Sequence, residues 1–371
     1  MNRFSPQAKP SPIVIIAEAG VNHNGQLALA RQLVEAAAEA GADAVKFQTF
    51  RTEQLVSRQA PKAAYQRART DPNASQFDMI QQLELDHENH AILRDHCRKC
   101  GIAFLSTPFD ALSLDFLVND MHLEVLKISS GEVTNGPFLV RVGATQCRII
   151  LSTGMSTLGE VEEALGALAF GLLQVEDSPS RAGFAAAFAS PKGQEALARQ
   201  VTLLHCTTEY PTAFADVNLR AMDTLRQAFG LPVGFSDHTA GIVIPIAAAA
   251  RGAVVIEKHF TLDRSLPGPD HQASLEPDEL TRMVEAIRQV EIALGHGCKI
   301  PVEAELANRV VARKSLIATA PIDKGERFTV DNLGVKRPGS GISPMEYWNW
   351  LGRVAGRGYL LDECMDREDL S

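Results

Sequence analysis

Two histidines in the second half of the sequence are spaced in a way that suits a metal site. His238 follows the apolar run 233–235, and His259, 21 residues later, follows the apolar run 254–256. The segment between them, 241–252, is rich in Ile and Ala and has the length of a helix. In such a strand–helix–strand unit both imidazoles lie at the carboxyl ends of parallel strands, where they can bind one divalent ion. The alternative is that both are ordinary hydrogen-bonded histidines.

The elements that must position these histidines follow a pattern that occurs eight times along the chain. Each unit has a short apolar run with a polar end, and helical segments separate the runs. The predicted strands begin at Ile13, Ala44, Ala103, Glu124, Arg148, Val201, Val233 and Val254. Continuous apolar strands alternating with helices predict an α/β fold, a (β/α)₈ TIM barrel. A doubly wound open sheet is the alternative, but no G-x-G-x-x-G motif follows the first strand.

Polar side chains occur at every predicted strand end, and barrel enzymes have their active sites at these ends. The residues are Glu18, Lys46, Gln48, Thr107, Lys127, Ser130, Glu132, Ser152, Thr207, Thr208, Ser236, His238 and His259. Two lysines at strand ends are costly to bury unless an anion lies between them. Hydroxyl and backbone N–H groups near Ser130 and Ser152 add donors for phosphate or carboxylate oxygens. For an individual Ser or Thr, the alternative is an ordinary turn residue.

Composition and charge limit the classes of protein to consider. A chain of 371 residues with 45% hydrophobic content can bury a large core and form more than one domain. The net charge of −9 argues against general nucleic-acid binding, and no run is apolar for long enough to span a bilayer. Six scattered cysteines are typical of reduced intracellular thiols. We therefore expect a cytoplasmic protein that binds neither nucleic acid nor membranes.

The sequence predicts two domains joined by a linker. Residues 1–294 form the catalytic barrel, 295–312 the linker, and 313–371 a small domain of short strands and turns. Within the barrel, the polar stretch 51–82 is predicted to be a loop over one end of the domain. The stretch 174–200, rich in Ser, Pro, Gly and Ala, is predicted to be a surface elaboration.

Eight motifs in the barrel segment resemble a known family. They are IAEAGVNHNG at 16–25, VKFQT at 45–49, LSTPFD at 105–110, KISSGE at 127–132, STGM at 152–155, SDH at 236–238, EKHF at 257–260 and GPD at 268–270. In type and order these motifs are similar to those of the sialic acid synthase family. Residues 313–371 resemble the antifreeze-like (SAF) domain of the same family.

The resemblance implies a condensation of phosphoenolpyruvate with an N-acetylated hexosamine that depends on Mn²⁺ or Mg²⁺. It implies binding of phosphoenolpyruvate by Lys46, Thr107, Lys127, Ser130, Ser152 and Ser236. The sugar would be held by Gln48, Tyr210, Asp270 and Arg337, and the metal by His238 and His259. Lys127 and His238 would act directly at the reacting groups. Glu132, with Glu18 as the second choice, would activate the water that attacks C2 before phosphate leaves by C–O cleavage.

The acceptor sugar is predicted from two further motifs. The stretches 205–211 and 267–275 look like the neuraminate branch, which implies an N-acetylneuraminate synthase acting on N-acetylmannosamine. The alternative is the N,N'-diacetyllegionaminate branch, with the same chemistry on a 2,4-diacetamido-trideoxy-mannose, and the pseudaminate branch is more distant. Two other classes stay open: an aldolase with a Schiff base on Lys127, and a sugar-binding protein without catalytic activity.

The resemblance also implies a homodimer with exchanged tails, in which Arg337 completes the site of the other chain. The linker 295–312 supports this expectation. Its 18 residues, at roughly 3.3 Å per extended residue, would reach well past the barrel to which they are attached.

Overall fold

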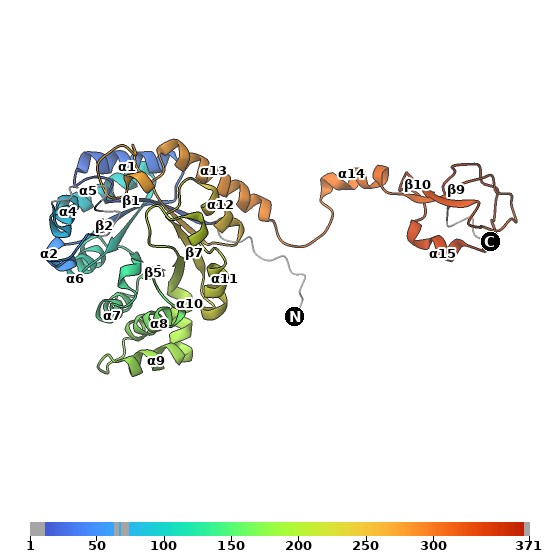
Figure 1. Ribbon diagram of the computed structural model, residues 1–371. Coiled ribbons are helices and arrows are strands. Elements are labelled where there is room, and N and C mark those ends of the chain that lie inside the picture. Colours follow the sequence, from blue (N-terminus) through green and yellow to red (C-terminus); the bar gives the residue numbers. More distant parts are fainter. Residues whose placement is uncertain (1–11, 63–66, 68–73, 367–371) are drawn as a thin grey trace. The chain divides into compact units, whose positions relative to one another are not determined.

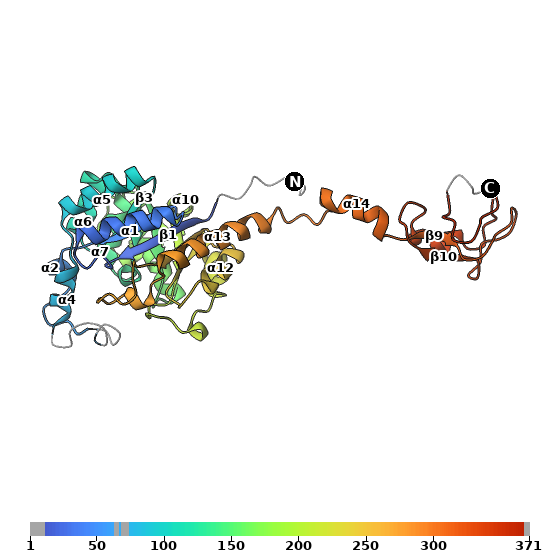
Figure 2. The same cartoon turned by 90° about the horizontal axis from the view of Figure 1, so that it is seen from above.

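The chain forms two compact units, divided between His296 and Gly297. The computed structural model describes residues 12–62, 67 and 74–366. The first unit contains helices and a central sheet, and the second is smaller and has two strands (Figures 1 and 2).

The first unit is the predicted barrel of eight parallel strands. These are β1 Val14–Gly20, β2 Ala44–Thr49, β3 Ala103–Pro108, β4 Val125–Ile128, β5 Arg148–Ser152, β6 Val201–His205, β7 Val233–Asp237 and β8 Val255–His259. They follow one another in the order β3-β2-β1-β8-β7-β6-β5-β4, and β3 also contacts β4, which closes the sheet. Because all strands run in the same direction, their carboxyl ends meet at one rim of the barrel.

Helices surround the strands (Figure 1). They include α1 Leu27–Glu39, α5 His87–Cys100, α7 Gly136–Ala144, α8 Leu158–Leu172, α11 Ala221–Phe229, α12 Val243–Ala250 and α13 Pro277–Leu294, and the short α6 is Ala111–Asp115. Their ends follow local sequence signals. For example, the Asp86 side chain accepts a hydrogen bond from the backbone N–H of Asn89 at the start of α5, and Gly101 takes the left-handed conformation that ends it.

The inward side chains change from apolar to polar along the strands. One layer of the interior is an apolar cluster of Ile16, Ala44, Leu105, Ile150, Leu204 and Val255. Two residues further along the same strands stand Glu18, Lys46, Thr107, Ser152 and Glu257. Since alternate residues of a strand face the same side, the polar layer lies directly above the apolar one, toward the carboxyl rim.

The stretch predicted to be a loop and the stretch predicted to be a surface elaboration both contain helices. The stretch 51–82 includes α2 Thr52–Leu55 and α4 Gln76–Leu83, so the prediction of a loop is wrong for these parts. Helix α4 starts at a capping box, in which the Ser75 hydroxyl and the Asp78 carboxylate each bind the other's backbone N–H. The stretch 174–200 includes two further helices, α9 Arg181–Ala189 and α10 Pro191–Gln200.

The second unit has its own small core. Strands β9 Ser315–Ala318 and β10 Leu333–Lys336 pair antiparallel, and the core includes Leu316, Phe328 and Trp350. Trp350 ends the short helix α15, Tyr347–Trp350. Helix α14, Glu303–Ala312, lies within the segment predicted as the linker. In the part of the chain that the structure describes, no helix has both the length and the apolar character needed to cross a membrane.

Candidate active site

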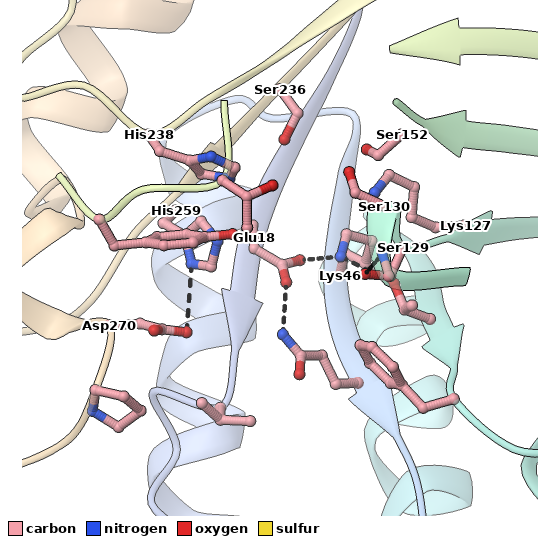
Figure 3. A pocket seen from close by; sticks show the side chains of 18 of the residues that line it. Glu18, Lys46, Lys127, Ser129, Ser130, Ser152, Ser236, His238, His259 and Asp270 are labelled. Atoms are coloured by element: carbon pink, nitrogen blue, oxygen red, sulfur yellow. Dashed lines mark hydrogen bonds and ion pairs between the residues drawn. The ribbon is translucent and has the colours of Figure 1, made fainter. Parts of the chain in front are cut away.

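A cavity of about 430 Å³ lies at the carboxyl ends of the barrel strands (Figure 3). Most of the side chains selected from the sequence line it: Glu18, Lys46, Gln48, Thr107, Lys127, Ser130, Ser152, Tyr210, Ser236, His238, His259 and Asp270. Glu132 is not among the described residues that line the cavity. Arg337 is exposed and belongs to the second unit, and its role in sugar binding stays a prediction.

Four buried charged residues form what we call the cavity charge cluster: Glu18, Lys46, Lys127 and Glu257. Lys46 Nζ lies 2.6 Å from Glu18 Oε2 and 3.7 Å from Glu257 Oε2. Lys127 Nζ lies 3.4 Å from Glu257 Oε1, and Lys46 Nζ also donates to Thr107 Oγ1 at 3.1 Å. The carboxylate of Glu257 therefore lies between the two lysines.

The pKa values of the cavity charge cluster follow from burial and from these contacts. Burial raises the pKa of Glu18 to about 7, with Lys46 opposing the shift and the charge of Glu257 adding to it. Burial also acts to raise the pKa of Glu257, but Lys127 and Lys46 together lower it to about 2. For Lys46, the two carboxylates outweigh burial and raise the pKa. When Glu18 is protonated, two lysines face one carboxylate, and the cluster attracts an anion.

Three serine hydroxyls surround this cluster (Figure 3). Ser236 Oγ donates to Glu257 Oε1 at 2.8 Å, and Ser130 Oγ accepts a hydrogen bond from the Gly154 N–H at 2.9 Å. The Ser152 hydroxyl is buried and has no hydrogen-bond partner among the described residues. Buried hydroxyl groups are normally paired, so Ser152 suits an oxygen of a bound ligand.

Two imidazoles lie on the other side of the cavity. The rings of His238 and His259 are 5.4 Å apart, centre to centre. His238 Nδ1 lies 2.6 Å from the carbonyl oxygen of Thr207; because a carbonyl only accepts, Nδ1 carries the proton and Nε2 keeps its lone pair. His259 Nδ1 is buried without a hydrogen-bond partner among the described residues, and it lies 3.9 Å from Asp270 Oδ2. The ring of Tyr210 packs against both imidazoles.

This histidine pair fits a divalent metal ion. Burial lowers the pKa of His238 to about 4 and the pKa of His259 well below its usual value. Both rings are therefore neutral at pH 7, as metal-binding imidazoles must be. No group of three or more His, Cys, Asp or Glu side chains with metal-site geometry occurs among the residues that the structure describes. An ion held by the two histidines would complete its coordination with water or substrate oxygens.

The two glutamates considered for water activation lie in different settings. Glu132 ends the short 3₁₀ turn Ser130–Glu132, and its Oε2 accepts a hydrogen bond from Asn135 Nδ2 at 2.7 Å. Burial raises the pKa of Glu132. Glu18 lines the cavity and also accepts a hydrogen bond from Gln48 Nε2 at 3.3 Å. The order of preference between them stays a prediction.

Two parts of this site were not predicted from the sequence. Glu257 stands two residues before His259 on β8, so strand alternation places both side chains inside the barrel and was the available signal. The second part is an apolar side of the cavity, formed by Val21, Phe50, Leu55, Met79, Ile80, Leu83 and Phe109. Three of these residues belong to α4, which was predicted as loop; the capping box of Ser75 and Asp78 was the signal.

Comparison with known proteins identifies relatives along most of the chain. The NeuB family matches residues 33–299, and the SAF domain matches residues 313–357. An N,N'-diacetyllegionaminic acid synthase of Campylobacter jejuni is 50% identical, over 95% of this chain and 98% of that protein. The Legionella pneumophila enzyme of the same name is 43% identical, over 95% of this chain and 93% of its own. The crystal structure of an N-acetylneuraminic acid synthetase from Leptospira borgpetersenii has a TM-score of 0.63 and 33% identity, covering 80% and 90% of the two chains.

These relatives correct the predicted acceptor. The stretches 205–211 and 267–275 favoured N-acetylneuraminate synthase, but the relatives with 50% and 43% identity are both N,N'-diacetyllegionaminic acid synthases. The neuraminate prediction is therefore wrong, and the alternative has the better support. The physical reason is that these stretches contain Tyr210 and Asp270, which lie against the two imidazoles. A sugar bound with its aldehyde at these imidazoles would meet them with its C1–C2 end, where both candidate acceptors carry the same aldehyde and 2-acetamido groups.

Proposed function

Because this chain belongs to the NeuB family, we propose that it is an N,N'-diacetyllegionaminate synthase. It would condense phosphoenolpyruvate with 2,4-diacetamido-2,4,6-trideoxy-mannose and release phosphate. The observation that carries the proposal is the near full-length similarity to two enzymes of that name. The cavity supports it chemically, since two lysines and a pair of neutral imidazoles line the same space.

Phosphoenolpyruvate would bind at the cavity charge cluster. Its phosphate and carboxylate groups need cationic donors, which Lys46 and Lys127 supply. Thr107, Ser130, Ser152 and Ser236 add hydroxyl groups around the two lysines. The hydroxyl of Ser152 is the clearest of these, because it has no hydrogen-bond partner among the described residues and can donate to a ligand oxygen.

The sugar would bind beside the histidines with its aldehyde toward phosphoenolpyruvate. A Mn²⁺ or Mg²⁺ ion on His238 and His259 would supply a Lewis acid that polarises the aldehyde oxygen. Gln48, Tyr210 and Asp270 line this part of the cavity and would position the sugar hydroxyls. The lysines would hold phosphoenolpyruvate so that C3 forms the new bond to the aldehyde carbon. Water then adds to C2, and phosphate leaves with the bridging oxygen.

The water needs a base, for which Glu132 is the first candidate and Glu18 the second. Burial raises the pKa of Glu132, so the wild-type rate should rise with pH through a value above 4.5. Replacing the true base with Gln should lower kcat by about 10²–10⁴-fold and remove this acidic limb of the pH profile. Parallel profiles of Glu132→Gln and Glu18→Gln decide between them; an acidic limb that persists in Glu132→Gln would exclude that residue.

The proposed function is tested by acceptor choice. Purified full-length protein with Mn²⁺ and phosphoenolpyruvate should release phosphate faster with 2,4-diacetamido-2,4,6-trideoxy-mannose than with N-acetylmannosamine. The comparison uses kcat/KM for each sugar, with product identity checked by mass spectrometry. A higher kcat/KM for N-acetylmannosamine would refute the proposal.

We further propose that the active unit is a homodimer with exchanged C-terminal units, so that Arg337 reaches the sugar in the other chain. Lys46→Ala and Arg337→Ala chains, each inactive alone, are mixed under conditions that permit subunit exchange. Exchanged tails give each heterodimer one site with both defects and one with neither, and activity returns. Heterodimers that form without recovering activity would refute the exchange.

A further inference from the structure

One side of the active-site cavity is apolar. We call it the apolar wall and define it as Phe50, Leu55, Met79, Ile80, Leu83 and Phe109. All except Met79 belong to, or pack against, a hydrophobic cluster that is separate from the main barrel core. Phe50 and Phe109 touch edge to face, with ring centres 6.4 Å apart, and Leu55, Ile80 and Phe109 are only partly buried. The wall therefore has apolar surface left to cover.

The apolar wall begins where the polar part of the cavity ends. On the β2 side of the cavity, Lys46, Gln48 and Phe50 all line it at alternate positions. The neighbouring strand repeats this order, because Thr107 accepts from Lys46 and Phe109 contacts Phe50. Two residues of extended chain, from Gln48 to Phe50, span roughly 6.6 Å, a length comparable with an open six-carbon chain. An acceptor that starts at the imidazoles and passes Gln48 would end against the wall.

The two candidate acceptors differ at that far end. N-acetylmannosamine carries hydroxyl groups at C4 and C6, and each loses hydrogen bonds to water if it is pressed against an apolar surface. The trideoxy sugar carries a methyl group at C6 and an acetamido group at C4. The methyl groups at C6 and on the C4 acetamido group gain from burial against Leu55, Ile80 and Phe109. Gln76, at the start of α4, lines the same side of the cavity and offers an amide for the acetamido group.

We propose that the apolar wall binds the C4–C6 end of the acceptor and selects the diacetamido-trideoxy sugar against N-acetylmannosamine. The proposal rests on the proposed function and names the residues that determine its specificity. Four of the six wall residues belong to α2 and α4, which lie outside the eight strands that position the reacting groups.

The test introduces a polar group into the wall. Leu55→Asn and Ile80→Thr each alter one partly buried side chain. For the wild type, we expect kcat/KM to favour the trideoxy sugar by about 10²-fold. This is the discrimination that an apolar pocket achieves against a ligand with an added hydroxyl group. In each wall variant that ratio should fall about tenfold, through a lower value for the trideoxy sugar, while the KM of phosphoenolpyruvate is unchanged.

Matched controls are available on α13. Ile292→Thr and Leu294→Asn make the same changes at side chains that are 82% and 49% exposed, and they should leave the ratio at the wild-type value. Thermal unfolding of all four variants establishes that each is folded. A wild type that prefers N-acetylmannosamine overturns the proposed function itself. A wild type that prefers the trideoxy sugar, with an unchanged ratio in both wall variants, overturns the role of the wall alone.

Discussion

Strands β7 and β8 carry buried charges on both of their faces, and the two faces differ. Ser236 pairs in register with Glu257 on the inner face, and Asp237 pairs with Lys258 on the outer face. Lys258 Nζ lies 2.5 Å from Asp237 Oδ2 and also donates to the carbonyl oxygen of Thr239. The Asp237 carboxylate accepts two further hydrogen bonds, from the backbone N–H and the hydroxyl of Thr239. Both charged side chains are 0% exposed.

The cavity charge cluster is buried almost as deeply but is less well paired. Lys127 has one ion-pair partner among the described residues, Glu257 at 3.4 Å, and the nearby Ser152 hydroxyl has no partner there. Burial of charge is therefore not by itself a sign of function. The difference is that the outer pair satisfies its own hydrogen-bonding groups, whereas the inner cluster leaves donors directed at a cavity.

The largest expected effect is on catalysis at the inner face. Lys127→Met removes a cation from the cavity charge cluster, and kcat/KM for phosphoenolpyruvate should fall about 10³-fold, or about 4 kcal/mol of transition-state stabilisation. Glu257 keeps its contacts with Lys46 and Ser236, so the variant should stay folded. Steady-state kinetics and circular dichroism measure the two quantities. Activity within tenfold of wild type would show that the inner cluster is structural, like the outer pair.

The outer pair should show the opposite response. Lys258→Met leaves the Asp237 carboxylate buried without its cation, and the free energy of unfolding should fall by about 3–5 kcal/mol. The double variant Asp237→Leu/Lys258→Met removes both charges and should regain most of this loss. Arg141→Met breaks a half-exposed pair with Asp115 and serves as the control, with an expected loss below about 1 kcal/mol. If denaturant unfolding showed that Lys258→Met loses as little free energy of unfolding as the control, the distinction between the outer pair and the inner cluster would be contradicted.

The two faces also show which strand and site residues can be predicted from the sequence and which cannot. Eight apolar runs were enough to predict the barrel, and the polar residues after them gave most of the cavity. The run at 233–235 ended too early, because β7 continues through Ser236 to Asp237. Local hydrophobicity identifies only the apolar part of a strand and does not predict a buried charged residue. Lys258 is buried because Asp237, 21 residues away, neutralises its charge. The apolar wall depends on short helices whose burial is decided by distant strands.

A third prediction concerns pH. Burial raises the pKa of Glu18 from 4.5 to about 7, so the folded protein favours the protonated acid. Its contribution to stability is full below pH 4.5 and is lost as pH rises through about 7. Glu18→Gln should abolish this loss, which is on the order of 3 kcal/mol. Denaturant unfolding at pH 5 and pH 8 measures it. An equal pH dependence in wild type and Glu18→Gln would mean that the inner cluster is as self-neutralised as the outer pair.

The smallest expected effects come from removing a single hydroxyl group on the inner or the outer face. Ser152 Oγ has no hydrogen-bond partner among the described residues, so Ser152→Ala should leave the free energy of unfolding nearly unchanged. If that hydroxyl binds phosphoenolpyruvate, its removal should raise the KM by roughly tenfold, since one hydrogen bond to a charged group contributes about 1.5 kcal/mol.

The reciprocal change is Thr239→Val on the outer face. It removes a hydroxyl that donates to the buried Asp237 carboxylate at 3.0 Å, so it should lower the free energy of unfolding by about 1–3 kcal/mol. The KM of phosphoenolpyruvate should not change, because Thr239 does not line the cavity. Unfolding and kinetic measurements on both variants complete the test. If Ser152→Ala lost stability and left the KM unchanged, its hydroxyl would belong to the packing of the barrel, and the inner face would lose its clearest unpaired donor.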